Sequence, residues 1–315
     1  MNHQQARARF EKLGIVALPQ PSEKTPALNP DYVFRDDMSN EIAGFWLMGT
    51  PAMKLVGHKG CGKTSVVEQF HAALNYPLVK VTAHPRMEAA SLLSQFVPDP
   101  KGGFVHRYGP LALAAKAGCS VLIDEYNLLD PGEAASLNII LERGMFEIVE
   151  TGEVIRPSDG FRVFVACNPN DKAAGYFGRN DQDSSNDDRF WTVFVEYPTA
   201  AEEVPVVQKI LSTLLDDATA KAYAENMVTV ANRVRKQYMG VSQDASALEL
   251  TMSTRTLINW AQGFTIFADA PSPLHYALER ALTNQKHGSA TKVAIHEIVA
   301  DVTGETVPTK PDPKP

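Results

Sequence analysis

Residues 57–65 read Gly57-His58-Lys59-Gly60-Cys61-Gly62-Lys63-Thr64-Ser65. The first eight fit the pattern G-x-x-x-x-G-K-[ST] without deviation, and this pattern is typical of phosphate-binding loops. Three glycines let the backbone curl so that successive N–H groups point into one concavity, which binds anions at the start of a helix. The apolar run 53–56 precedes the loop and a helical pattern follows it. This context favours a phosphate loop over a glycine-rich turn that matches by chance.

Two side chains of this loop have expected chemical roles. Lys63 would reach the β- and γ-phosphates of a nucleoside triphosphate, and the Thr64 hydroxyl would ligate Mg²⁺. We therefore predict that the segment from Gly57 to Ser65 binds ATP as its magnesium complex. The adenine site stays open, because residues 32–38 and the C-terminal helices are candidates by position alone.

From residue 52 the chain alternates between strand-like and helix-like patterns. The apolar runs expected to form strands are 53–56, 77–81, 120–123, 161–166 and 191–195. The helical patterns between them are 63–74, 87–96, 111–117 and 131–143. This alternation predicts a parallel sheet with helices on both faces. The expected fold class is α/β, a P-loop NTPase αβα sandwich, with an added hairpin at 145–157 that turns at Thr151-Gly152.

The strand signal stops after Pro198. Helical patterns then occupy 201–215, 219–238, 253–267 and 292–299. They predict an all-helical lid domain after the α/β core. The expected organisation is an N-terminal segment and connector at 1–44, a core at 45–200, a helical lid at 201–302 and a disordered tail at 303–315. The proline-rich run 19–30 favours an extended connector, and the sequence assigns no role to residues 1–44.

A second motif lies at 121–125, where Val-Leu-Ile is followed by Asp124 and Glu125. Ligands of parallel sheets bind beyond the carboxyl ends of the strands, so we expect both carboxylates near the phosphate loop. Asp124 is the predicted metal ligand together with Thr64. Glu125 would orient or deprotonate the attacking water. Many strands end in acidic residues, but a position two strands after an intact phosphate loop makes this motif specific.

The apolar run 163–166 ends in Cys167-Asn168-Pro169. Asn-Pro often opens a turn, which is the alternative to a chemical role. At the carboxyl end of a strand in this sheet, however, the Asn168 amide could hydrogen-bond both the γ-phosphate and the attacking water. We therefore interpret Asn168 as a sensor of the bound nucleotide.

Three arginines are candidates for contacts with the γ-phosphate. Arg189 precedes the last strand and faces away from its own site, so it could complete a neighbouring subunit's site as an arginine finger. The alternative is a surface salt bridge with Asp187 or Asp188. Arg179, in the same long polar loop, is the second candidate for the finger. Arg255 opens a helix of the lid, from which it would reach back to the γ-phosphate.

The composition excludes several classes of protein. The chain has 315 residues, of which 44% are hydrophobic and 21% charged, as in ordinary globular proteins. Its net charge of −7 argues against a dedicated nucleic-acid binder. The basic cluster Arg233, Arg235 and Lys236 is interpreted as a solvated helix face. The sequence shows neither a membrane span nor a signal peptide, and its three cysteines suit neither a disulfide framework nor a zinc site. We expect a cytoplasmic protein without membrane contact.

Together these elements resemble the AAA+ superfamily. Their spacing is similar to that of the MoxR group and its relatives, which include the CobS-type subunit of aerobic cobaltochelatase, the CbbQ/NirQ activators and dynein-related AAA modules. The resemblance is carried by residues 57–65, 77–93, 109–127, 150–169 and 187–198. It covers 45–200 closely and 201–300 loosely. One departure is Val-Ala-Cys-Asn at 165–168, where the family more often has Ala-Thr-x-Asn.

The resemblance implies a homo-oligomeric ring, usually a hexamer, that hydrolyses ATP between its subunits. The usual partner in such families contains a von Willebrand factor A domain. The ring remodels that partner, or inserts a metal or cofactor into a client protein. The resemblance also implies an inserted hairpin at about 95–107, which often faces the ring pore, and a second hairpin at 146–155.

Three functions compete at this stage. The first is a ring-forming ATPase that acts on a protein client. The second is a nucleic-acid-directed P-loop translocase or restriction-type NTPase, against which the acidic charge counts. The third is a small-molecule phosphotransferase, which would be monomeric and would need neither an outward arginine nor Arg255. The sequence names neither the client nor the number of subunits in a ring.

Overall fold

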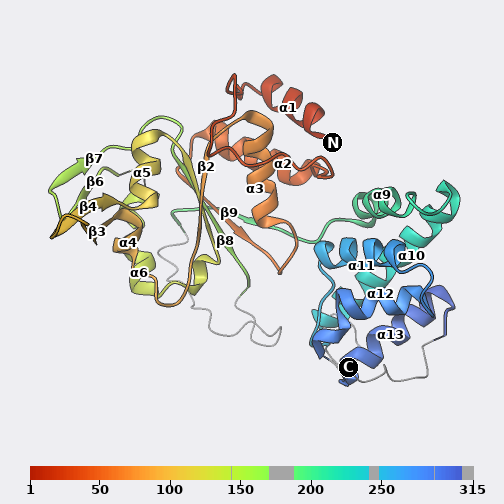
Figure 1. Cartoon of the computed structure of the whole chain (residues 1–315). Helices are drawn as coiled ribbons and strands as arrows, with labels where there is room; N and C mark the ends of the chain where they lie inside the picture. Colours follow the sequence, from red (N-terminus) through yellow and green to blue (C-terminus); the bar gives the residue numbers. More distant parts are fainter. Residues whose placement is uncertain (143, 170–187, 241–247, 287, 307–315) are drawn as a thin grey trace. The chain divides into compact units, whose positions relative to one another are not determined.

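The structure is a computed structural model that describes residues 1–142, 144–169, 188–240, 248–286 and 288–306. The chain folds as two compact units (Figure 1). The first runs from Met1 to Glu196 and the second begins at Tyr197, except that Lys59–Cys61 groups with the second unit. The division falls close to residue 200, where the strand signal of the sequence stops.

In the described part of the first unit, a five-stranded parallel sheet has the order β2-β5-β8-β1-β9. Its strands are β1 (Ala52–Val56), β2 (Leu78–Thr82), β5 (Ser120–Asp124), β8 (Arg162–Cys167) and β9 (Trp191–Phe194). Each corresponds to an apolar run predicted to form a strand. The predicted α/β fold class is confirmed.

Helices cover both faces of the sheet. Figure 1 shows α2 (Asp36–Met48) and α3 (Lys63–Leu74) on one side and α5 (Pro110–Ala117) on the other. The side chains of neighbouring residues in β8 point to opposite faces of the sheet, as they do in any β-strand. Val163 and Val165 belong to the core cluster that includes α5, whereas the ring of Phe164 meets that of Phe45 in α2 at 5.2 Å.

The N-terminal segment packs against α3. In α1 (His3–Lys12), the ring of Phe10 contacts that of Phe70 in an edge-on arrangement with 5.0 Å between centroids. His3 Nε2 and Gln69 Oε1 form a buried hydrogen bond of 2.8 Å. The connector that follows runs past the end of α3, where the Leu18 N–H donates to the Leu74 carbonyl. The N-terminal segment therefore adds its buried side chains, such as Phe10, Ile15 and Phe34, to the core of the first unit.

Two predicted helices differ from the structure. The pattern at 87–96 yields only α4 (Ala89–Leu93), because the chain from Ser94 pairs as β3 (Ser94–Pro98) with β4 (Phe104–Tyr108). This pairing confirms the hairpin expected at 95–107. The pattern at 131–143 splits into α6 (Pro131–Ser136) and α7 (Asn138–Leu141), because the N–H of Leu137 closes α6 with a tighter bond to the Ala134 carbonyl.

The second predicted hairpin is present as β6 (Phe146–Ile148) and β7 (Glu153–Ile155). Its turn contains Gly152, whose φ of 69° is the left-handed conformation that glycine adopts without strain. A hydrogen bond of Glu153 with Tyr108 and an ion pair of 2.6 Å with Lys116 link this hairpin to β4 and α5.

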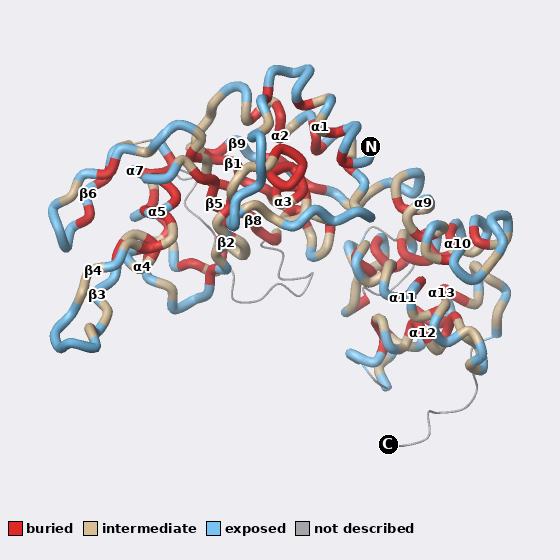
Figure 2. Tube along the Cα trace, turned by 45° about the horizontal axis from the view of Figure 1, so that its top comes forward, coloured by how far each residue is buried: buried red, intermediate tan, exposed pale blue. Residues whose placement is uncertain are grey.

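The described part of the second unit is helical (Figures 1 and 2). Its α-helices are α9 (Ala200–Leu211), α10 (Asp217–Tyr238), α11 (Thr254–Ile266), α12 (Pro273–Ala281) and α13 (Ala290–Thr303). Their apolar faces enclose a separate core around Trp260, whose indole N–H donates to the Leu274 carbonyl at 2.9 Å. Among the described helices of the chain, none has both the length and the apolar character needed to cross a bilayer.

One interpretation of the sequence is wrong in this unit. Arg235 does not belong to a solvated helix face, because only 2% of it is exposed and it forms a buried ion pair with Glu203. Arg233, two residues earlier, does lie at the surface, where it pairs with Asp301. The difference arises because a helix turns 100° per residue, so basic residues two positions apart point in different directions.

Burial of His71 in α3 predicts a loss of stability in acid. Desolvation lowers the pKa of His71 to about 4, although a hydrogen bond to the Val67 carbonyl opposes the shift. Between pH 6.5 and 4 the unfolded chain binds a proton that the folded chain does not. Above pH 6.5 His71 is neutral in both states and does not change the free energy of unfolding. As the pH falls from 6.5 to 4, the free energy of unfolding should decrease by about 3 kcal/mol in total because of this histidine.

Urea unfolding of a His71→Gln variant between pH 7.5 and 4 tests this expectation. Loss of the ring lowers stability at every pH, so the comparison is between slopes, and the slope of the variant should be shallower. The slope of the variant should not fall to zero, because burial also lowers the pKa of His296 to about 4 and this histidine is unchanged in the variant. The exposed His84→Gln is the matched control. Equal slopes for wild type and His71→Gln would contradict the assignment.

Candidate functional site

The predicted phosphate loop joins β1 to α3. The Gly57 N–H donates to the Cys167 carbonyl at 3.1 Å, which ties the start of the loop to the end of β8. Gly60 and Gly62 have φ values of 76° and 99°, a region that residues with a Cβ rarely adopt. Gly62 is the N-cap of the 12-residue α3, so the free N–H groups of this helix begin at the loop. Such a helix N-terminus favours an anionic ligand.

Lys63 is the first residue of α3, and only 7% of it is exposed. Its Nζ donates to the carbonyls of Gly57 at 2.7 Å and His58 at 2.9 Å, and to Asn168 Oδ1 at 2.9 Å. The ammonium group is thus held inside the curl of the loop, between β1 and β8. A cation in this position complements phosphate oxygens bound by the loop backbone.

The remaining predicted loop residues differ in burial. Cys61 is buried, whereas Lys59 is exposed and His58 and Ser65 are partly exposed. In P-loop sites, the backbone N–H groups of the loop contact the phosphates, rather than side chains such as these. The type of side chain at these positions therefore matters less than the backbone path.

Thr64 and Asp124 meet at the same edge of the sheet. The Thr64 hydroxyl donates to Asp124 Oδ2 at 3.1 Å, and Asp124 Oδ1 accepts from the Glu125 N–H at 2.9 Å. A hydroxyl and a carboxylate are hard oxygen donors, which Mg²⁺ prefers, and it usually takes only one or two protein ligands in addition to phosphates. The residues present therefore fit a magnesium site of the kind predicted from the sequence.

Glu125 has an unusual backbone. Its φ of 55° is left-handed, a conformation that costs a non-glycine residue on the order of 1–3 kcal/mol. The chain then enters a short 3-10 helix, Tyr126–Leu128. Both carboxylate oxygens of Glu125 accept from Asn168 Nδ2, at 3.1 and 3.0 Å. This turn directs the carboxylate toward β8 and Asn168.

Asn168 connects the two charged groups of the site. Its amide donates to Glu125 and its carbonyl oxygen accepts from Lys63, so the three side chains form one chain of hydrogen bonds. Only 5% of Asn168 is exposed. Asn127 donates from Nδ2 to the Asn168 main-chain carbonyl at 2.8 Å, which fixes the end of β8. Sequence reasoning missed Asn127, although it stands just after the Asp-Glu pair.

Register explains why these residues meet. Val56 of β1 pairs with Cys167 of β8, and Ile123 of β5 pairs with Val165 of β8. The residues that follow these strands therefore leave the sheet at one edge, as expected for a parallel sheet. The predicted residues Lys63, Thr64, Asp124, Glu125 and Asn168 come together there.

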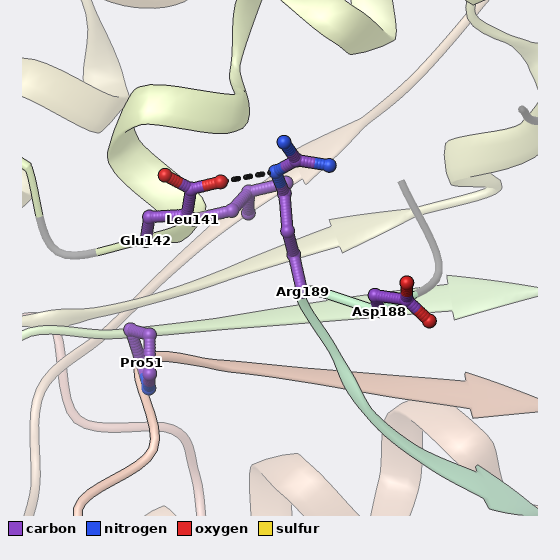
Figure 3. A pocket seen from close by; sticks show the side chains of 5 residues that line it. All are labelled: Pro51, Leu141, Glu142, Asp188 and Arg189. Carbon is purple, nitrogen blue, oxygen red and sulfur yellow. Dashed lines mark hydrogen bonds and ion pairs between the residues drawn. The ribbon is translucent and has the colours of Figure 1, made fainter. Parts of the chain in front are cut away.

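Arg189 lies at the opposite ends of the strands. It precedes β9, whose Trp191 pairs with Met53 near the start of β1, whereas the phosphate loop follows the end of β1. Arg189 Nε donates to Glu142 Oε1 at 2.5 Å, a partner that the sequence did not suggest. Figure 3 shows this pair beside Pro51 at a surface cavity of about 560 Å³.

The other two arginines remain predictions. Arg179 lies outside the described residues. Arg255 is exposed in the first turn of α11, whose N-cap Ser253 accepts from the Thr256 N–H at 3.0 Å. It belongs to the second unit, whereas Lys63 and Asn168 belong to the first.

Comparisons with known proteins identify two successive domains in the chain. Residues 52–190 match the AAA domain of the dynein-related subfamily, and residues 210–302 match the CbbQ/NirQ/NorQ C-terminal domain. The aerobic cobaltochelatase subunit CobS from Sinorhizobium sp is 26% identical over 88% of this chain and 86% of its own length. The denitrification regulatory protein NirQ from Stutzerimonas stutzeri is 29% identical over 74% of this chain and 80% of its own length. Midasin from Giardia intestinalis is 24% identical over 76% of this chain, which spans only 5% of midasin.

The parallel sheet, the phosphate loop and the polar residues at its edge define a P-loop ATPase of the AAA+ class. The two matched domains, one after the other, narrow this class further. The chain belongs to the MoxR-like AAA+ family, to which CobS and NirQ are related.

Proposed function

We propose that this chain hydrolyses MgATP at the interfaces of a homo-oligomeric ring and uses the reaction to remodel or activate a protein client. The observation that carries this proposal is the arrangement of Lys63, Asn168 and Glu125 in one hydrogen-bonded chain at the phosphate loop. Arg189 lies at the opposite ends of the strands from its own phosphate loop, which supports a role for it at a neighbour's site.

The chemistry follows from the positions of these groups. The loop backbone and Lys63 bind the phosphates of ATP, and Thr64 and Asp124 hold Mg²⁺. When bound, the metal neutralises charge on the phosphate oxygens. Glu125 accepts the proton of the attacking water, which the Asn168 amide helps to orient. Arg255 of the same chain contacts the γ-phosphate, and Arg189 of the adjacent subunit stabilises the charge that develops on it during transfer.

The client is proposed to be a protein. Two relatives are named as a subunit of a cobaltochelatase and as a denitrification regulatory protein, and a subunit and a regulator both act together with other proteins, which supports a protein partner. Phe96 and Phe104, which are 54% and 71% exposed, are placed by the hairpin β3–β4 at the surface of the first unit. A hexameric ring and a partner with a von Willebrand factor A domain, with metal insertion as one variant, complete the proposal.

Replacing Lys63 by alanine should abolish most of the ATPase activity. The variant loses the cation that complements the phosphates, and removal of one such donor typically lowers kcat by roughly 10²–10³-fold. The measurement is phosphate release from MgATP by purified protein, together with nucleotide affinity by calorimetry. Lys12→Ala, at an exposed position in the last turn of α1, is the matched control. Activity at the wild-type level in Lys63→Ala would refute a phosphate-binding role for this loop.

The ring is tested separately by mass. Light scattering of wild-type protein with and without MgATP should show a closed oligomer in the presence of nucleotide. A protein that stays monomeric at concentrations where it hydrolyses ATP would contradict hydrolysis at subunit interfaces. That result would favour a phosphotransferase that acts on a small molecule.

A further inference from the structure

The chain passes from the first unit to the second through Glu196 and Tyr197. On the first side of this junction, the Glu196 carbonyl accepts from Arg35 Nη1 at 2.7 Å. The other terminal nitrogen of Arg35 donates to Asp37, at the start of α2, also at 2.7 Å. The last residue of the first unit is thus anchored to that unit by an arginine.

A second arginine lies on the other side of the junction. The guanidinium carbon of Arg235 stands over the ring of Tyr197, 4.4 Å from its centroid. An arginine at this distance from an aromatic face is attracted by the negative potential of the ring. Arg235 belongs to α10, so Tyr197, the first residue of the second unit, is bound to the longest helix of that unit.

Arg235 also makes a buried, two-pronged ion pair. Its Nη1 and Nη2 donate to the two carboxylate oxygens of Glu203 in α9, at 2.7 and 2.8 Å, and each of these residues is only 2% exposed. The third nitrogen, Nε, donates to the Met252 carbonyl at 2.7 Å, and Nη1 also donates to Asn232 Oδ1 at 3.0 Å. Because the guanidinium is planar, contacts on its edge and on its face fix both its position and its orientation.

The same network reaches the start of α11. Glu203 Oε1 accepts a second hydrogen bond from the Thr254 hydroxyl at 2.7 Å. Met252 and Thr254 flank the N-cap Ser253, and Arg255 is the next residue. A continuous set of contacts within the second unit therefore runs from Tyr197 through Arg235 and Glu203 to the turn that carries Arg255.

This network is better suited to fixing geometry than to raising stability. Burying two charges carries a desolvation cost that their attraction only partly offsets, and apolar pairs of similar volume often give equal or greater stability. Breaking such a pair by removing one partner is costly, because the other charge stays buried. Unlike an apolar pair, the ion pair with its further hydrogen bonds fixes the positions of α9, α10 and the start of α11 relative to Tyr197 at the junction.

We propose that Arg235 is a positioning residue for the ATPase reaction, which holds the Arg255 turn in a fixed place relative to the junction at Tyr197. The proposal rests on the proposed function, in which Arg255 contacts the γ-phosphate. Any rotation at the junction then carries Arg255 with it as part of one rigid group, so nucleotide contact and movement of the second unit are coupled. Without the network we expect the helices still to pack, but the turn that carries Arg255 would no longer be held at a fixed position relative to Tyr197.

The test uses a paired replacement, Arg235→Met with Glu203→Leu, so that no charge is left buried. The pair is expected to fold, with a melting temperature near or above that of wild type. Its kcat should fall on the order of tenfold, while the dissociation constant for ATP changes much less. A single Arg235→Lys variant, which keeps the charge but not the fork of donors, should show an intermediate loss.

A cycle with Arg255→Ala separates positioning from mere structural support. If Arg235 acts through Arg255, the paired replacement should lower kcat little further once Arg255 is absent. A purely structural defect would reduce the active fraction by the same factor in both backgrounds, and such multiplicative losses would overturn the proposal. Wild-type kcat in the folded pair would also overturn it. Arg233→Met, on the same helix at an exposed ion pair, is the matched control and should leave kcat unchanged.

The outcome is distinguishable from failure of the proposed function itself. If Lys63→Ala and Arg255→Ala both retain full activity, the assigned ATP site is wrong, whatever Arg235 does. If both lose activity but the Arg235 effect is multiplicative with that of Arg255→Ala, the site stands and only the positioning role of Arg235 fails.

Discussion

A Glu125→Gln protein is expected to bind ATP with almost unchanged affinity and to hydrolyse it about 10²–10⁴-fold more slowly, the usual contribution of a general base. Glutamine keeps the size of the side chain and its place beside Asn168 but cannot accept the proton of the attacking water. The contacts that bind the phosphates, from the loop backbone and Lys63, are left in place. Binding and turnover should therefore separate.

The measurements are calorimetric titration with MgATP and single-turnover phosphate release by the same preparation. Glu88→Gln, at an exposed position before α4, provides the control for a lost carboxylate. Turnover at the wild-type rate in Glu125→Gln would remove Glu125 from the role of base. Joint loss of affinity and turnover would instead indicate that Glu125 supports the shape of the phosphate loop through Asn168. The bound, slowly hydrolysing state would also be the form in which to capture a client.

The left-handed backbone at Glu125 strengthens this expectation. A glycine at this position would adopt φ of 55° without strain, and the sequence holds glutamate there instead. Strained residues persist where the surrounding structure holds them in place, and they gather at active sites. The observation supports a chemical role for the carboxylate, because packing alone gives no reason to accept the cost.

The edge of the sheet where the site forms was predictable from the sequence. Parallel strands place their carboxyl ends together, so runs ending in Gly57, Asp124 and Asn168 had to deliver these residues to one edge. Only local apolar runs and the α/β alternation were needed for this step. The roles of these residues in catalysis remain predictions, since geometry shows proximity and not reaction.

Contacts between residues far apart in the sequence were not predictable. Glu142 as the partner of Arg189, and Glu203 as the partner of Arg235, depend on how separate elements pack. Local charge patterns indicated a solvated face for Arg235 because its partner lies in another helix, 32 residues away. The helical pattern was drawn too far, to residue 96, for a related reason: the strand from Ser94 is stabilised by pairing with β4 rather than by its own residues, and only the family resemblance indicated the hairpin there.

Replacing Arg189 by alanine is expected to lower kcat by about 10³–10⁵-fold if this residue is the arginine finger of the adjacent site. The phosphate loop of the variant is intact, so its affinity for ATP should change little. Arg86→Ala, at an exposed position before α4, controls for loss of a surface cation. A modest loss, comparable to that of the control, would instead match the alternative of a surface ion pair with Glu142.

Mixing two inactive variants decides whether Arg189 acts on a neighbouring subunit. Arg189→Ala subunits keep the phosphate loop, and Lys63→Ala subunits keep the arginine. If subunits mix at random in equal amounts in a ring with head-to-tail interfaces, roughly a quarter of the interfaces unite an intact loop with an intact arginine. Activity should therefore reappear on mixing and vary with the ratio of the two variants. An inactive mixture, in rings shown to contain both variants, would indicate that Arg179 is the finger or that Arg189 acts only within its own subunit.

Glu142 holds Arg189 within its own subunit through an ion pair. A Glu142→Gln change in the Lys63→Ala partner should therefore preserve the rescue, because it removes a competitor for the guanidinium and not a contact of the site.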